Sequence, residues 1–99
     1  MSYKSDLIKK AELGDAEAQF NLATAYYVAI IPNKKKAFYW YECAAKQGHP
    51  EAQRFLGMCY LCGEGVKADE QMAYEWYILS ARNGDVEAQK FLKTRGISY

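Results

Sequence analysis

The chain has 99 residues, of which 51% are hydrophobic, enough for one small domain with a compact core. Its 13 basic and 12 acidic residues leave a net charge of +1, so no long-range field favours nucleic acid, an anionic membrane or an acidic substrate. The first residues include an acid and no apolar run, so they do not resemble a secretory signal. Three cysteines, an odd number, argue against a disulfide framework, and we therefore expect a cytoplasmic protein.

Apolar and small residues recur at steps of three and four, which predicts helices rather than strands. In the second helix, for example, Ala18, Leu22, Ala25, Tyr26 and Ala29 share one predicted apolar face. A glycine that can end a helix, then a residue that can cap the next, separates segments at Gly14–Asp15, Gly48–His49 and Gly84–Asp85. Asn33 and Asp69 are further predicted caps. The predicted helices cover residues 4–13, 16–30, 34–47, 50–62, 70–83 and 86–94.

The chain repeats itself. The segments AELGDAEAQFNLATAYY, AKQGHPEAQRFLGMCYL and ARNGDVEAQKFLK align without a gap, and their glycines lie 34 and 36 residues apart, a period typical of stacked helical units. The segments KAFYWYECAAKQG and MAYEWYILSARNG also align, which makes Trp40 and Trp76 equivalent core residues. The first unit is two residues shorter, so we expect a tighter connecting loop there.

These repeats predict an all-α fold, an α/α superhelix or solenoid of stacked antiparallel helix pairs. Its six helices follow the order B, A-B, A-B, A, where A and B denote the first and second helix of a pair. We predict one domain over residues 1–99, divided into a capping helix (1–13), repeat 1 (14–47), repeat 2 (48–83) and a partial repeat 3 (84–99). Lys90 and Lys93 blunt the last helix, and open ends make a monomer or weak homodimer the expected state.

The second unit resembles the Sel-one-like repeat, a branch of the tetratricopeptide-like families. It carries the pattern A-x-x-G-x-x-x-A-x-x-x-L-G-x-x-Y, then G-x-G-V-x-x-D and A-x-x-W-Y, at Ala45, Gly48, Ala52, Leu56, Gly57, Tyr60, Gly63, Gly65, Val66, Asp69, Ala73, Trp76 and Tyr77. The resemblance extends from Ala11 to Leu92. Unit one departs from the pattern with Ala23 in the place of Gly57, and unit three has Lys93 there.

The resemblance implies a right-handed superhelix whose A helices line a concave groove. It also implies a role as an adaptor or scaffold for other proteins, as in other members of the family, some of them bacterial. Some secreted bacterial relatives carry paired cysteines eight residues apart at the unit boundary. Ala45 and Gln53 occupy those places here, so the resemblance excludes that disulfide-bonded subtype.

The same resemblance directs a set of A-helix side chains toward the groove, namely Phe20, Thr24, Tyr27, Arg54, Met58, Leu61, Lys90 and Thr94. Apolar groups rimmed by Arg54 and Lys90 suit a peptide or partner protein with an acidic edge, with Tyr27 and Met58 as anchors. The open alternative is that side chains in so short a solenoid cover one another. No cofactor or metal is implied.

Two other functions stay open: an immunity-type inhibitor of a bacterial toxin, acting through the ends or loops, and a thiol or metal protein. The second would use Cys59 and Cys62, but they lie near a helix C-terminus, where the dipole disfavours a thiolate. His49 is predicted to be a cap and Glu64 an exposed turn residue, so no catalytic group is indicated and we expect no enzyme. Residues 34–36, three lysines, are interpreted as a solvated first helical turn.

Overall fold

The computed structural model describes residues 2–99, and these residues form six helices and no strand. The helices are α1 (Tyr3–Glu12), α2 (Ala16–Tyr27), α3 (Lys34–Lys46), α4 (Pro50–Cys62), α5 (Glu70–Arg82) and α6 (Val86–Thr94). They confirm the predicted all-α class and the helix order. Within the described part of the chain, none of them has the length and apolar character needed to cross a bilayer.

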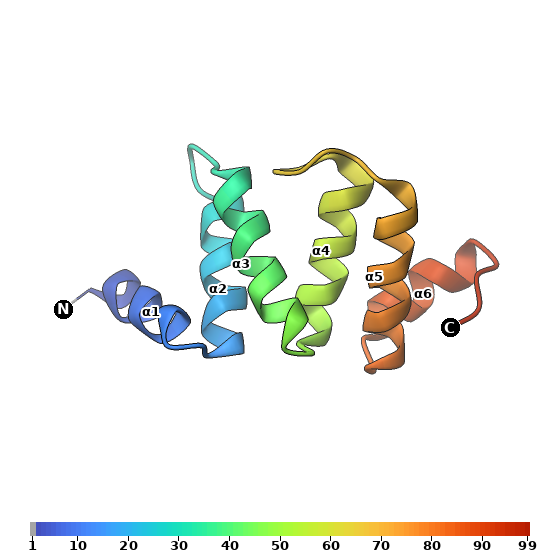
Figure 1. Cartoon of the computed structure of the whole chain (residues 1–99), viewed down its shortest axis with the longest axis horizontal. Helices are drawn as coiled ribbons and strands as arrows, with labels where there is room; N and C mark the ends of the chain where they lie inside the picture. Colours follow the sequence, from blue (N-terminus) through green and yellow to red (C-terminus); the bar gives the residue numbers. More distant parts are fainter. Residues whose placement is uncertain (1) are drawn as a thin grey trace.

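Successive helices pack against each other, and the stack extends along one axis, with overall dimensions of 47 × 25 × 18 Å (Figure 1). The apolar core follows this axis as three clusters centred on Leu7 and Leu22, on Tyr41 and Leu56, and on Tyr77 and Leu92. Trp40 and Trp76 are both half-buried and pack against these clusters, as the repeat predicted. The hydrophobic core therefore runs along the stack as three successive clusters, and Tyr26 and Trp40 pack against both of the first two.

The helix ends follow the local sequence signals. Each helix begins with a side chain that accepts a hydrogen bond from a backbone N–H three residues later, and the caps are Ser2, Asp15, Asn33, His49, Asp69 and Asp85. Gly14, Gly48 and Gly84 have φ values of 98°, 91° and 95°, a conformation that glycine adopts without strain. All of the predicted caps are confirmed, and Ser2 adds one that the sequence analysis did not identify.

The prediction was wrong for the end of α2, which stops at Tyr27 instead of residue 30. The backbone N–H of Asn33 donates to the carbonyl of Tyr26 (3.1 Å), so the chain turns back toward α3 before another helical turn can form. Unit one is two residues shorter than unit two, and this difference is divided between the helix α2 and the loop that follows it. α2 has 12 residues where α4 has 13, and the loop 28–33 is one residue shorter than the loop 63–69.

The predicted apolar face of α2 also needs correction, because Ala25 and Ala29 are exposed. Ala29 lies in the loop beyond the helix. Ala25 is equivalent to the buried Cys59 of α4, but α1 has ten residues where α3 has thirteen. The shorter helix leaves this end of α2 uncovered.

A row of amide side chains links the turns of successive units. In each unit a glutamine on the A helix donates to the carbonyl of the residue eight positions earlier, as Gln19 to Ala11 (3.0 Å), Gln53 to Ala45 (3.1 Å) and Gln89 to Ala81 (2.9 Å). The residue that ends the following B helix then donates to the glutamine oxygen, from Gln47 to Gln19 (2.8 Å) and from Asn83 to Gln53 (2.9 Å). We call these five bonds the glutamine ladder.

Replacing Gln53 by Leu should lower the free energy of unfolding by about 1–3 kcal/mol, because Gln53 is 1% exposed and the change removes two ladder bonds at nearly constant volume. Gln89→Leu is the matched control. It removes one such bond at a half-buried position and should cost about 1 kcal/mol or less. Denaturant unfolding of both variants measures the difference, and equal losses would show that the ladder adds nothing between units.

Candidate functional site

The eight side chains predicted to face the groove lie on the A helices in three rows, which follow from the repeat spacing. The first row is Phe20, Arg54 and Lys90, the second is Thr24, Met58 and Thr94, and the third is Tyr27 and Leu61. We call the side of the molecule formed by α2, α4 and α6 the A-helix face. The rows differ in how far their side chains are already engaged within the chain.

Phe20 lies in the core, with 9% of its surface exposed. Its ring stacks on His49 (centroids 4.8 Å apart) and touches Phe55 (5.6 Å) and Tyr41 (5.8 Å). The His49 ring is fixed by two bonds: its Nδ1 accepts from the Ala52 N–H (3.1 Å), so its Nε2 carries the proton that is donated to Glu17 (2.7 Å). Phe20 thus joins α2 to α4.

Arg54, one repeat later, meets a different partner in the same position. Its Nε donates to Asp85 Oδ1 (3.0 Å), the same oxygen that accepts from the Ala88 N–H (2.8 Å) and caps α6. Glu51 lies 3.9 Å from the other end of the guanidinium. The contact between neighbouring A helices is therefore an aromatic stack on His49 in one unit and an ion pair with Asp85 in the next.

Arg54, Lys90 and Thr94 converge on one hollow of about 360 Å³, whose other lining residues are Tyr77, Glu87 and Phe91. The rings of Tyr77 and Phe91 stack at 4.0 Å with an interplanar angle of 19°. Burial raises the pKa of Tyr77 to about 12, so its phenol is neutral at physiological pH. This hollow combines two cations, one carboxylate, two hydroxyl groups and an aromatic surface.

The remaining predicted residues lie outside this hollow. Thr24 shares a hydrogen bond with the Tyr41 hydroxyl (3.0 Å). Met58 and Leu61 are half-buried and pack against the C-terminal core cluster. The structure thus brings three of the eight residues together and distributes the other five along the stack.

Tyr27 belongs to a separate cluster at the far end of α2. Its hydroxyl donates to Glu64 (3.0 Å), and the Lys34 ammonium lies 3.5 Å from the ring centroid and 3.2 Å from the Glu64 carboxylate. Burial first, and then the bond to Glu64, raise the pKa of Tyr27 to about 12. The prediction that Glu64 is an exposed turn residue was therefore wrong, because this half-buried side chain ties the loop 63–69 to the first unit.

Three residues of the hollow were not among the predicted site residues, namely Glu87 and the aromatic pair Tyr77 and Phe91. A signal for the aromatic pair exists, because Tyr41 and Phe55 stand 36 residues earlier and their rings also stack, at 5.3 Å and 7°. In the earlier unit Phe20 covers that pair, whereas Arg54 is drawn aside toward Asp85 in the later one. We call the two equivalent contacts, Phe20 on His49 and Arg54 on Asp85, the two seats. The difference between them shapes the hollow.

Comparison with known proteins identifies the family. The Sel1 repeat model matches residues 16–49 and 50–85. This chain belongs to the Sel1 repeat family. The resemblance noted in the sequence is confirmed, and Sel1 repeats are in general non-catalytic modules for protein–protein interaction.

Solved Sel1-type structures share the fold. A Sel1 repeat protein from Oxalobacter formigenes is 38% identical with a TM-score of 0.85, over 89% of this chain and 68% of its own. A protective antigen of uropathogenic Escherichia coli with the same fold is 34% identical (TM-score 0.81), over 97% of this chain and 22% of its own. Cysteine-rich protein B of Helicobacter pylori, at 23% identity and TM-score 0.83 over 90% of this chain and 68% of its own, supports the fold alone. These neighbours confirm the helical solenoid.

A curated relative is an F-box protein of Arabidopsis thaliana, 37% identical over 59 residues. The match covers 60% of this chain and 17% of the plant protein. The chain therefore spans about a sixth of that relative.

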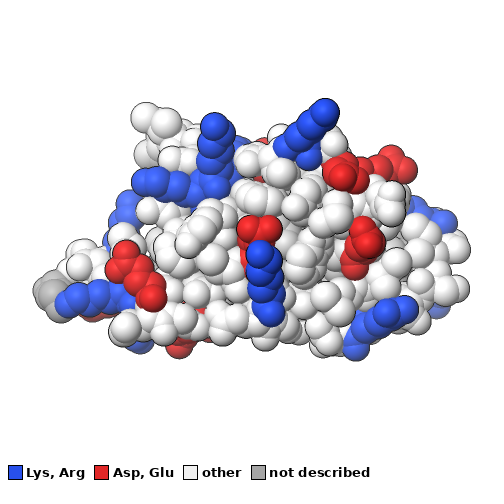
Figure 2. Space-filling model, viewed as in Figure 1, with Lys and Arg blue, Asp and Glu red and all other residues white. Residues whose placement is uncertain are grey.

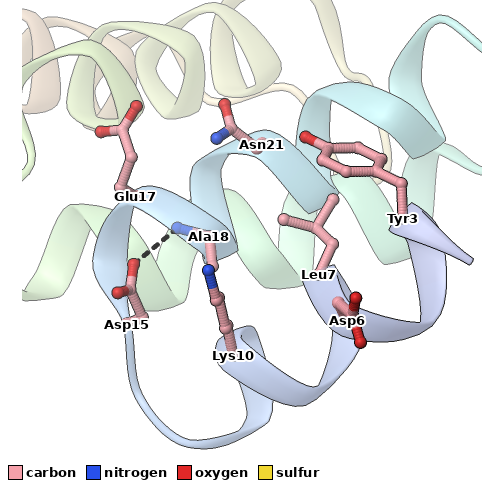
Figure 3. Close-up of a pocket in the computed structure, with 8 residues that line it drawn as sticks. All are labelled: Tyr3, Asp6, Leu7, Lys10, Asp15, Glu17, Ala18 and Asn21. Carbon is pink, nitrogen blue, oxygen red and sulfur yellow. Dashed lines mark hydrogen bonds between the residues drawn. The ribbon is translucent and has the colours of Figure 1, made fainter. Parts of the chain in front are cut away.

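A second hollow, of about 350 Å³, lies between α1 and α2 at the N-terminal end of the Sel1 stack (Figure 3). By the repeat spacing, its Leu7, Asp15 and Asn21 correspond to Tyr77, Asp85 and Phe91 of the first hollow. It is the place where the helix before α1 would lie in a longer array. Lys10 takes the position of the fully buried Ser80, so a long charged side chain stands where another Sel1 unit would pack.

The last helix of the Sel1 stack carries a similar obstacle. At Gly57 of α4 an added Cβ would lie 2.9 Å from the Tyr77 ring and 3.1 Å from the Ala73 carbonyl, so α5 packs directly against the α4 backbone. Lys93 occupies the equivalent position in α6 and is exposed. A further B helix cannot pack on α6 as closely as α5 packs on α4.

The cysteines of this Sel1 protein are free thiols, and Cys59 is buried while Cys62 is exposed. Burial, with a further contribution from the charge of Glu64, raises the pKa of Cys59 to about 12. Among residues 2–99, no three His, Cys, Asp or Glu side chains are grouped as metal ligands would be. The burial of Cys59 disfavours the thiol-redox interpretation of the CxxC pair.

Exchanging the two seats should show that they are alternatives. Phe20→Arg alone should cost about 2–4 kcal/mol of stability, because it removes three aromatic contacts. Adding His49→Asp should recover about 1–2 kcal/mol, since the introduced arginine would lie between Glu17 and the introduced carboxylate, as Arg54 lies between Glu51 and Asp85. Denaturant unfolding of both single variants and the double variant gives the coupling energy, and strictly additive losses would contradict equivalent seats.

The thiols should differ in alkylation by iodoacetamide. In the folded protein at neutral pH, Cys62 should react rapidly, and Cys59 should stay unmodified because its pKa of about 12 and its burial withhold the thiolate. Peptide mapping by mass spectrometry reads both sites, with the denatured protein as the control. Equal rates for the two sites in the folded state would contradict the assignment.

Proposed function

We propose that this chain is a non-catalytic binding module that holds a segment of another protein on its A-helix face. The observation that supports this function best is the hollow between α4 and α6, where Arg54, Lys90 and Thr94 meet the stacked rings of Tyr77 and Phe91. Lys90 has 69% of its side chain exposed and a partner, Glu87, only at 3.8 Å, so its ammonium is available to an incoming anion.

The chemistry of the hollow favours a peptide with an acidic residue next to an apolar or aromatic one. The carboxylate would approach Lys90 and the outer edge of Arg54, whose Nε remains committed to Asp85. The neighbouring apolar side chain would lie against the exposed part of the Phe91 ring, next to Arg95, whereas Tyr77 is buried and supports that ring from behind. Such a pairing would give orientation as well as affinity, because the charged and the apolar side chain of the peptide would each need its own partner in the hollow.

The other predicted residues extend this surface along the stack. Tyr27 and Met58 are half-buried, so each offers part of its side chain as an anchor, with Thr24 and Leu61 beside them. Phe20 acts as a positioning residue, since it supports the ring of Phe55 from within the core. A segment that runs across all three A helices would meet these residues in chain order.

We further propose that the chain forms a single domain, that it is located in the cytoplasm, and that it is a monomer or a weak homodimer. Three free thiols suit a reducing compartment. Lys10 and Lys93 oppose end-to-end stacking, which supports the monomer. The proposed unit boundaries are 14–47, 48–83 and 84–99.

Partners captured on the immobilised chain and identified by mass spectrometry can be compared between two charge-reversed variants. Lys90→Glu should weaken the specific partner at least about tenfold, because a carboxylate would then face an acidic ligand. Lys93→Glu makes the same charge change in the same helix outside the hollow and should leave binding unchanged. The double variant Tyr27→Ala, Met58→Ala should also reduce binding while the helical circular dichroism is retained. Undiminished binding by Lys90→Glu and by the double variant would place the site elsewhere.

A further inference from the structure

The loop 28–33 between α2 and α3 exposes apolar side chains without covering them. Val28, Ile30 and Ile31 are 70%, 102% and 87% exposed, and Pro32 follows them. In the second unit the corresponding loop turns inward, and its Val66 packs against the core. The first loop, one residue shorter, does not do this, and its isoleucines stay exposed at the tip. We call residues 28–32 the apolar tip.

Lysines surround the base of the apolar tip. Lys36 and Lys4 lie 5.3 Å and 5.7 Å from the ring centroid of Tyr26, the second-last residue of α2, and Lys34 lies 3.5 Å from that of Tyr27. Lys35 is exposed between them in the chain. We call these four residues the lysine collar. Within the lysine collar, Lys34 forms an ion pair with the carboxylate of Glu64.

Figure 2 shows the combination as an uncharged protrusion at the upper left of the molecule with Lys and Arg side chains at its base. Figure 1 places the α2–α3 loop there, beyond the ends of both helices. Residues 28–36 contain no acidic side chain. Although the net charge of the chain is only +1, positive charge is therefore concentrated locally here, and the apolar side chains of the tip project beyond the lysine collar.

We propose that the apolar tip docks on the surface of an anionic lipid bilayer. The isoleucines would enter the boundary between headgroups and acyl chains, and the lysine collar would lie at the level of the lipid phosphates and carboxylates. A bilayer accepts a convex apolar tip of any shape, whereas a protein would need a matching pocket with an acidic rim. The charge of the collar selects anionic over zwitterionic lipid.

Vesicle co-sedimentation tests the proposal with the full chain. Vesicles of phosphatidylcholine mixed with phosphatidylserine should bind the protein more strongly than vesicles of phosphatidylcholine alone, and added salt should weaken that binding. Ile30→Ser and Ile31→Ser should each reduce the partition coefficient about tenfold or more, because each removes apolar groups from the inserted tip. Lys35→Gln should reduce it about fivefold.

Leu13→Ser provides the matched control. Leu13 is 87% exposed, as Ile31 is, but lies in the α1–α2 turn at the opposite edge of the molecule (Figure 1). Its replacement should leave vesicle binding unchanged, and circular dichroism should show that all variants stay folded. The proposal is overturned if the wild-type chain ignores phosphatidylserine, or if Leu13→Ser weakens binding as much as Ile30→Ser. It is equally overturned if the tip variants lose a protein partner while no vesicle binds, because the tip then belongs to that protein.

Discussion

The glutamine ladder is the constraint on which the rest of the stack depends. A turn between two helices leaves backbone carbonyls without helical partners, and burying them unpaired is costly. At the centre of the molecule the Ala45 carbonyl accepts from the Gly48 N–H (3.0 Å) and from the side chain of Gln53, which in turn accepts from Asn83 of the following turn. Hydrogen bonds, which are directional, thereby connect each turn to the next. Hydrophobic contacts hold the helices together, and the ladder fixes how far each unit is displaced along its neighbour.

Once the displacement is fixed, one position on each A helix always faces the cap of the next A helix. Phe20 meets His49 there and Arg54 meets Asp85. An aromatic pair and an ion pair are each self-consistent, but a phenylalanine on a carboxylate or an arginine on a neutral imidazole would be poorer. The arginine in the second contact does not cover the aromatic pair behind it, and the Phe91 ring instead has the Arg95 guanidinium 3.8 Å from its centroid, so the hollow takes its shape from that difference.

Local signals in the sequence predicted much of this fold. Caps, helix-ending glycines and the three-and-four spacing act within a few residues, so Asp15 or Gly48 could be interpreted without knowing what lies nearby. The errors involve contacts between units. Ala25 looked buried by its spacing, but its exposure depends on the length of α1. Glu64 looked exposed in a glycine-rich loop, but it reaches Tyr27 in the preceding unit. The hollow was half predicted, because Arg54 and Lys90 follow from the register whereas its aromatic lining needs the side-chain packing.

The two candidate surfaces depend on the stack in different ways. The hollow is assembled from α4, α5 and α6, so it exists only when the ladder and the Arg54–Asp85 pair hold those helices in register. The apolar tip is one short continuous segment, and its side chains are exposed in a loop that no other unit covers. Loss of register should therefore abolish binding in the hollow before it alters the tip. In a single small solenoid, one surface can thus depend on the packing of the helices while another does not. Binding of a partner in the hollow and docking of the apolar tip on a membrane could then be lost separately.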